Sequence, residues 1–160
     1  MSARNFALRI ARRGWAGALL SFSIRHFYRA LPLKRLSEDA DVVAFFHPVP
    51  SCDPHILIVP KQRARTVFDL SEPGFYAALR MGADIARRYE VPLQLRINGG
   101  ARQEVLQTHF HLCPRGNLKA CRAESYPAAL ALARGARWFS LIVPIDGQTG
   151  TAEGILVERD

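Results

Sequence analysis

The sequence predicts an α+β fold in which a mainly antiparallel sheet of about five strands surrounds one central helix. The clearest helix, 71–90, has Ser71 as a candidate N-cap and Pro73 in its first turn, and its apolar residues recur at helical spacing. Apolar segments lie on both sides of this helix and do not alternate regularly with helices, which favours α+β over α/β. A second helix is predicted over 125–137. The segments with the β-branched and aromatic composition of strands are 42–47, 55–60, 93–98, 104–113 and 138–145.

The composition indicates a globular domain in a reducing compartment. The chain has 160 residues, enough for a hydrophobic core, and its hydrophobic and charged contents of 49% and 22% are ordinary for a folded protein. The three cysteines, Cys52, Cys113 and Cys121, contain no CxxC pair. This pattern argues against a disulfide framework and against a zinc site of four cysteines.

The net charge of +8 belongs to the N-terminal segment. Eight basic residues precede the first acidic residue, Glu38, and the remaining 14 basic residues balance the 14 acidic ones. Residues 1–31 are therefore predicted to form a basic amphipathic helix, separate from a domain over 32–160. The apolar run within this helix, 14–24, is only eleven residues long, whereas a helix that spans a membrane needs about 20.

Three interpretations of this N-terminal helix remain open. It can pack on the domain with its arginines in solvent, lie at a membrane surface through residues 4–29, or act as a targeting peptide. Sedimentation with anionic vesicles separates the second interpretation from the other two. No nucleic-acid-binding motif accompanies the charge, so nucleic acid is not an expected partner.

The segment QEVLQTHFHLCPRG, 103–116, contains the most reactive side chains. Because alternate residues of a strand point to the same side, we expect Gln107, His109, His111 and Cys113 to share one face. Two imidazoles on one face are costly to bury unless they are hydrogen-bonded or functional. The alternatives are histidines with a structural role and a zinc site at His109, His111 and Cys113.

Three motifs, in the same order along the chain, resemble the histidine triad (HIT) superfamily of nucleotide hydrolases and transferases. QEVLQTHFHLCPR resembles the family's His-x-His-x-His motif, with Gln107 in the first position. In VVAFFHPVPSCDPHILIVPK, His55 precedes ILIVPK as a histidine precedes the family's second strand, and LRINGG resembles the strand that ends in Asn and glycines. The resemblance covers about residues 33–115. It implies an HIT-like fold and a homodimer whose sheet extends across both subunits.

The resemblance implies catalytic roles for four residues. His109 aligns with the nucleophile, whose Nε2 attacks phosphorus to form a phosphohistidine intermediate while a backbone carbonyl holds the proton on Nδ1. His111 aligns with the histidine that contacts the phosphate and serves the leaving group. His55 lines the site from the neighbouring strand, and Gln107 supports the site as a hydrogen bonder.

The resemblance also implies a substrate site without metal or cofactor. Asn98 would hydrogen-bond phosphate oxygens, and Gln103 is the glutamine that precedes the triad. Glu104 stands where the family often has a small hydroxyl residue near the phosphate. His47 stands where many members have an aspartate that binds the ribose hydroxyls. The cysteines are interpreted as packing residues.

The sequence therefore predicts a nucleotidyl hydrolase or transferase that acts on a phosphoramidate, a dinucleoside polyphosphate or a nucleotide diester. Because Gln107 and His47 depart from the family pattern, the alternative is a nucleotide-binding or interaction module without catalysis. Ligand affinity without turnover distinguishes this alternative. The predicted location is the cytoplasm, with peripheral membrane contact under the second interpretation of the N-terminal helix.

Overall fold

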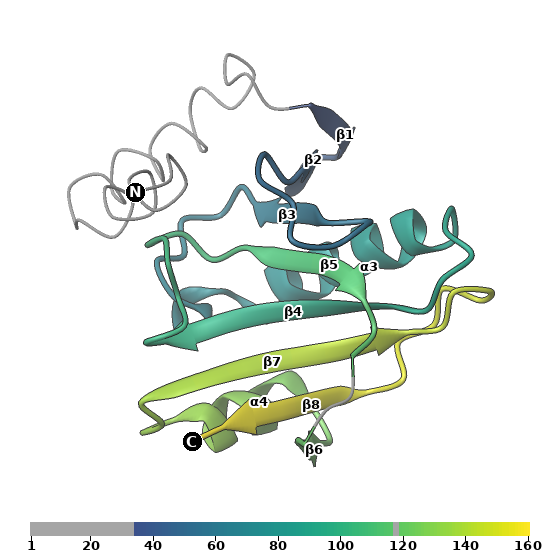
Figure 1. Cartoon of the computed structure of the whole chain (residues 1–160). Coiled ribbons are helices and arrows are strands. Elements are labelled where there is room, and N and C mark those ends of the chain that lie inside the picture. Colours follow the sequence, from purple (N-terminus) through teal and green to yellow (C-terminus); the bar gives the residue numbers. More distant parts are fainter. Residues whose placement is uncertain (1–33, 117–118) are drawn as a thin grey trace, which may run out of the picture.

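A sheet with two α-helices on one face makes up the part of the chain described by this computed structural model, residues 34–116 and 119–160 (Figure 1). The predicted helix over 1–31 lies outside the described residues. The helices are α3 (Glu72–Ala86) and α4 (Tyr126–Ala133), and a short 3₁₀ helix covers Val67–Asp69. The strands are β1 (Arg35–Glu38), β2 (Val42–Phe46), β3 (Ile56–Pro60), β4 (Leu93–Gly100), β5 (Phe110–Pro114), β6 (Cys121–Ala123), β7 (Trp138–Ile145) and β8 (Ile155–Arg159).

The strands follow the order β1-β2-β3-β5-β4-β7-β8-β6, and every neighbouring pair is antiparallel. The predicted α+β class is confirmed, but the described residues form eight strands rather than about five. Strands β1, β6 and β8 were not predicted. They have four, three and five residues, and segments this short carry little periodic signal.

The predicted strand over 104–113 is wrong in its first half, because β5 begins only at Phe110. Pairing with β3 starts at Phe110 opposite Ile58. Before that point the backbone follows a loop in which Thr108 N donates to the carbonyl of Ala64 at 2.7 Å. Gln107 therefore lies outside the strand, and the alternation of strand side chains does not extend to it.

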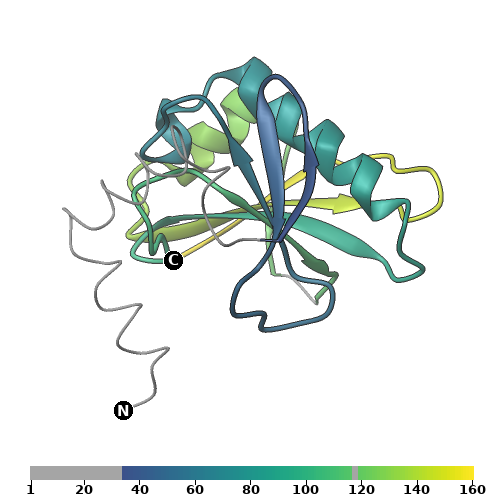
Figure 2. The ribbon, with the colours of Figure 1, turned by 90° about the horizontal axis from the view of Figure 1, so that it is seen from above.

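Helices α3 and α4 cover the same face of the sheet (Figure 2). Ser71 caps α3 by accepting a hydrogen bond from Gly74 N at 3.2 Å, as the sequence predicts. The helix lies very close to β4 at Gly82, where an added Cβ would meet Leu95 Cδ1 at 2.6 Å. A glycine at this position therefore lets α3 pack directly onto the strand that carries part of the candidate site.

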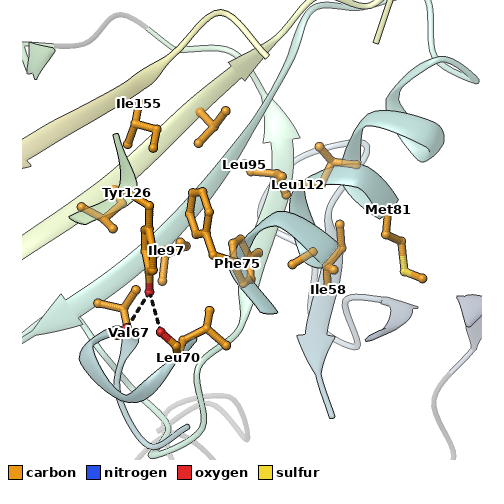
Figure 3. Close-up of a cluster of buried hydrophobic side chains, with 14 of the residues drawn as sticks. Ile58, Val67, Leu70, Phe75, Met81, Leu95, Ile97, Leu112, Tyr126 and Ile155 are labelled. Atoms are coloured by element: carbon orange, nitrogen blue, oxygen red, sulfur yellow. Dashed lines mark hydrogen bonds between the residues drawn. The ribbon is translucent and has the colours of Figure 1, made fainter. Parts of the chain in front are cut away.

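The centre of the core joins both helices (Figure 3). The rings of Phe75 and Tyr126 are stacked with centroids 4.1 Å apart and planes inclined by 15°. The hydroxyl of Tyr126 donates to the carbonyls of Val67 and Leu70 at 2.8 and 3.2 Å. A buried hydroxyl that lacks a partner is costly, so these carbonyls make a tyrosine suitable at this position.

The pairing of the strands limits how a dimer can form. Strand β4, which follows β5 in the sheet order, is paired with β5 on one side and β7 on the other. Among the described strands, only β1 and β6 have an unpaired edge. A homodimer that extends the sheet would therefore have to join through one of these two strands. No helix within the described ranges is long and apolar enough to cross a membrane.

We predict that Tyr126→Phe lowers the free energy of unfolding by about 1–2 kcal/mol, because the buried hydrogen bonding of the hydroxyl to the carbonyls of Val67 and Leu70 is lost while the ring packing is kept. Urea denaturation measures the change. Tyr76→Phe is the matched control, since Tyr76 is 37% exposed and no described hydrogen bond uses its hydroxyl. Equal effects of the two substitutions would show that the hydrogen bonds of Tyr126 do not stabilise the core.

Candidate active site

The candidate site lies on the sheet face opposite the helices. In β4, Leu93, Leu95 and Ile97 are buried in the core, so the side chains between them point to the other face. Arg96 of β4 is directly opposite His111 of β5 in the antiparallel register. A cleft of about 480 Å³ opens on this face. Its walls include the four histidines His47, His55, His109 and His111, together with Arg96, Asn98, Arg102 and Glu104.

The backbone sets the proton position of His109. Its Nδ1 lies 2.7 Å from the carbonyl oxygen of Gln107. A carbonyl can only accept, so Nδ1 carries the proton and Nε2 has a free lone pair. Burial lowers the pKa of His109, outweighing the opposing effects of the Gln107 carbonyl and of Glu104. The ring is therefore neutral, and it borders the cleft with its Nε2 unprotonated.

His55 and His111 have the opposite proton arrangement. Ser51 N donates to Nδ1 of His55 at 3.2 Å, so the proton of His55 is on Nε2. This Nε2 donates to Nδ1 of His111 over 2.9 Å, which places the proton of His111 on its own Nε2. Burial is the main cause that lowers the pKa of His55 to about 4 and that of His111 to about 2. Both rings are neutral near pH 7, and His111 is a hydrogen-bond donor in the cleft.

His47 extends this group of rings. It stacks on His55 with centroids 4.0 Å apart and planes inclined by 13°. Val49 N donates to Nδ1 of His47 at 3.1 Å, so the neutral ring carries its proton on Nε2. His47 thus lies beside both His55 and His111, with its ring centroid 4.0 and 6.0 Å from theirs.

A chain of hydrogen bonds orients Asn98. Nη1 of Arg102 donates to Ser140 Oγ at 3.2 Å, and Ser140 Oγ donates to Asn98 Oδ1 at 2.9 Å. Because Oδ1 accepts from Ser140, the amide NH₂ of Asn98 is available to a ligand in the cleft. Asn98 is predicted from the sequence but Ser140 is not, because strand β7 reaches the site only through its pairing with β4.

Two arginines that are not predicted from the sequence also line the cleft. Arg96 and Arg102 both border the cleft, and both contact Glu158 Oε2, at 3.4 and 2.7 Å. The guanidinium of Arg102 also lies 3.5 Å from the ring centroid of Trp138. Arg96 could have been found from the sequence, since it alternates with Asn98 along the strand predicted over 93–98. Nothing local indicated Arg102, which lies in the loop after β4.

The two predicted glutamines do not border the cleft. The side chain of Gln107 is buried, and its Nε2 donates to the carbonyls of Pro60 and Gln62 at 3.4 and 3.3 Å. Gln103 donates to the carbonyls of Arg65 and Val105 and so holds the loop before β5. Gln107 therefore contributes to the site through its backbone carbonyl, which contacts His109.

The predicted zinc alternative at His109, His111 and Cys113 is not the group that the described residues bring together. Ligand atoms of His47, His55 and His111 lie within 4.8 Å of one another instead. A metal-bound imidazole normally donates a hydrogen bond from its other nitrogen, whereas His47 and His55 accept backbone N–H groups at Nδ1. The arrangement therefore suits hydrogen-bonded imidazoles better than metal ligands. Burial also raises the pKa of Cys113, which favours the neutral thiol.

Comparison with known proteins identifies the family. The sequence model of the HIT domain matches residues 29–118, more than half of the chain, so the protein belongs to the HIT domain family. An uncharacterised HIT-like protein of Borreliella burgdorferi is 26% identical over 96 residues, which are 54% of this chain and 69% of that protein. Strands β7 and β8, which carry Ser140 and Glu158, lie beyond the family match.

Solved structures share the fold at low identity. A histidine triad protein from Clostridium difficile has 23% identity and a TM-score of 0.53, over 62% of this chain and 91% of that one. A histidine triad nucleotide-binding protein from Candida albicans has 20% identity and a TM-score of 0.52, over 71% and 90% of the two chains. At these identities the comparison establishes the fold alone. The chemistry of this chain has to be argued from the residues of its own site.

We predict that NMR of ¹⁵N-labelled imidazoles at pH 7 shows His109 protonated on Nδ1 and both His55 and His111 protonated on Nε2. A backbone carbonyl faces Nδ1 of His109, a backbone N–H faces Nδ1 of His55, and Nε2 of His55 in turn donates to Nδ1 of His111. Long-range ¹H–¹⁵N correlation spectra distinguish the two tautomers directly. The Nε2–H form of His109 would contradict the proton assignment made from its contact with Gln107.

We predict that the free energy of unfolding falls as the pH decreases below the ordinary histidine pKa of 6.5. The folded-state pKa of His111 is about 2 and that of His55 about 4, so the unfolded chain binds protons that the folded protein excludes. The contribution of the two rings to stability is therefore full above pH 6.5. As the pH falls, it is lost between 6.5 and 4 for His55 and between 6.5 and 2 for His111, by on the order of 1 kcal/mol per pH unit from His111. Urea denaturation at pH 7, 6 and 5 measures the slope. An unchanged slope in His111→Asn would exclude His111 as its source.

Proposed function

We propose that the protein is a nucleotidyl hydrolase or transferase in which His109 attacks a phosphate of a nucleotide-like substrate. The observation that carries this proposal is the 2.7 Å contact between His109 Nδ1 and the carbonyl of Gln107. This contact leaves Nε2 unprotonated in a ring that stays neutral and borders the cleft. A neutral imidazole held in one tautomer is the form of histidine that can act as a nucleophile.

The reaction proceeds in two displacements. Nε2 of His109 forms a bond to phosphorus, and the bond between phosphorus and the leaving group breaks, with its electron pair going to the leaving atom. The ring then carries positive charge, which the carbonyl of Gln107 stabilises through the Nδ1 proton. A water or an acceptor hydroxyl then attacks the same phosphorus and releases its proton to solvent, while the P–N bond breaks and its electrons return to Nε2.

Neutral donors around His109 support the same chemistry. The Nε2–H of His111 and the NH₂ of Asn98 are fixed before substrate binds, by the His55 contact and the Ser140 contact respectively. Donors that are oriented in advance stabilise the charge that develops on phosphate oxygens without reorganising. His47, which stacks on His55, would hydrogen-bond the sugar of the nucleotide through its Nε2–H.

A second candidate function is nucleotide binding without turnover. The observation that favours it is the position of Gln107, which replaces the first histidine of the motif and turns its side chain away from the cleft. In this function the same donors would bind phosphate while no covalent intermediate forms.

We predict that the wild type hydrolyses a fluorogenic nucleoside phosphoramidate or a dinucleoside polyphosphate and that His109→Ala loses at least 10³-fold in kcat/KM, because no other group replaces the nucleophile. Substrate labelled at the attacked phosphate should leave acid-labile label on the wild type alone. Arg88→Gln is the matched control, since Arg88 is exposed and lies just after the helix that covers the opposite face.

The two candidate functions give different results in this experiment. Turnover that survives in His109→Ala would remove His109 from the mechanism. Nucleotide binding by the wild type with no turnover and no label on the protein would favour the binding module.

A further inference from the structure

Two arginines supply positive charge to the cleft wall. Arg96 is on β4 and Arg102 is in the loop that follows it, and both border the same cleft as His109. His55, His109 and His111 are neutral near pH 7, because burial lowers the pKa of each ring. The positive charge available to an anionic ligand therefore comes from the arginine pair and not from these histidines.

Residues of strands β7 and β8, which lie beyond the family match, hold the two arginines in place. Glu158 of β8 contacts both guanidiniums, at 2.7 Å from Arg102 and 3.4 Å from Arg96. Arg102 is held further by Ser140 Oγ at 3.2 Å and by the ring of Trp138, 3.5 Å from the guanidinium carbon. One carboxylate faces two guanidiniums, so this group retains one net positive charge.

Arg96 has hydrogen-bonding capacity that its described neighbours do not use. Its Nε is buried and has no hydrogen-bond partner among the described residues. Its contact with Glu158 uses only Nη2. Because this Nε is closed off from solvent, a phosphate in the cleft would bind to the Nη groups instead. The side chains of Arg96 and Arg102 are 31% and 36% exposed, and the described contacts of Arg102 use only its Nη1. The remaining Nη groups of the two arginines can therefore donate to the oxygens of a phosphate.

We propose that Arg96 and Arg102 form a second anion subsite, which binds the phosphate next to the one that His109 attacks. This inference rests on the proposed function and narrows it to substrates whose leaving group is itself a phosphate, such as nucleoside polyphosphates. When Nε2 of His109 bonds to the attacked phosphorus, the bridging P–O bond breaks and its electron pair stays on the leaving phosphate. The new negative charge then lies beside the two guanidiniums.

A binding experiment tests the subsite without requiring turnover. Isothermal titration of the full-length protein with AMP and with ADP compares one phosphate with two on the same nucleoside. The wild type should bind ADP at least tenfold more tightly than AMP, and Arg96→Gln should reduce this ratio at least fivefold. Arg96→Lys keeps the charge but loses the planar fork, so its ratio should be intermediate. Arg88→Gln should keep the wild-type ratio.

Turnover then separates the subsite from the proposed function. The ratio of kcat/KM for a dinucleoside polyphosphate to that for a nucleoside phosphoramidate should fall at least tenfold in Arg96→Gln. An ADP preference without any turnover dependent on His109 would reject the proposed function and keep the subsite. Turnover that depends on His109, with equal affinity for AMP and ADP, would keep the function and reject the subsite. If circular dichroism shows that Arg96→Gln does not fold, Arg96→Lys takes its place. A wild-type ratio of ADP affinity to AMP affinity in Arg96→Lys would then reject the subsite.

Discussion

The antiparallel register between β4 and β5 is the constraint on which both the core and the candidate site depend. Leu95 lies opposite Leu112, and Arg96 lies opposite His111. Because neighbouring residues of a strand face opposite sides, burying the leucines under α3 places the arginine and the histidine on the open face. A slip of one residue would bury the charged side chain and expose the apolar one, so core packing holds the site in register.

Backbone groups determine which ring nitrogen of each histidine carries the proton. A carbonyl faces Nδ1 of His109, whereas an N–H faces Nδ1 of His55 and sets the proton of His111 through one further hydrogen bond. His109 thereby presents a lone pair at its Nε2, whereas the neighbouring neutral ring of His111 presents an N–H donor. The contact to His109 is made by the main chain of Gln107, so it does not depend on which side chain occupies that position. The proton position of His109 is therefore kept with glutamine in place of the first histidine of the motif.

Local signals predicted much of the fold. The cap and apolar spacing of the helix predicted over 71–90 were sufficient to identify α3, and the composition of 55–60 and 93–98 identified β3 and β4. The start of β5 was misplaced because the loop over 103–109 is held by long-range contacts, including the one from Thr108 to Ala64. Such contacts leave no periodic pattern in the sequence, and the same is true of the three short strands that were missed.

The sequence by itself determined the family and the principal residues of the candidate site, because His55, Asn98, His109 and His111 belong to motifs readable along the chain and all four border the cleft. Tertiary structure alone decided which groups support them. It turned the side chain of Gln107 away from the cleft, and it brought Ser140, Trp138 and Glu158 beside Asn98 and Arg102. The physical reason is that strand pairing joins segments that are distant along the chain, and the hydrogen bonds that orient a functional group depend on those neighbours.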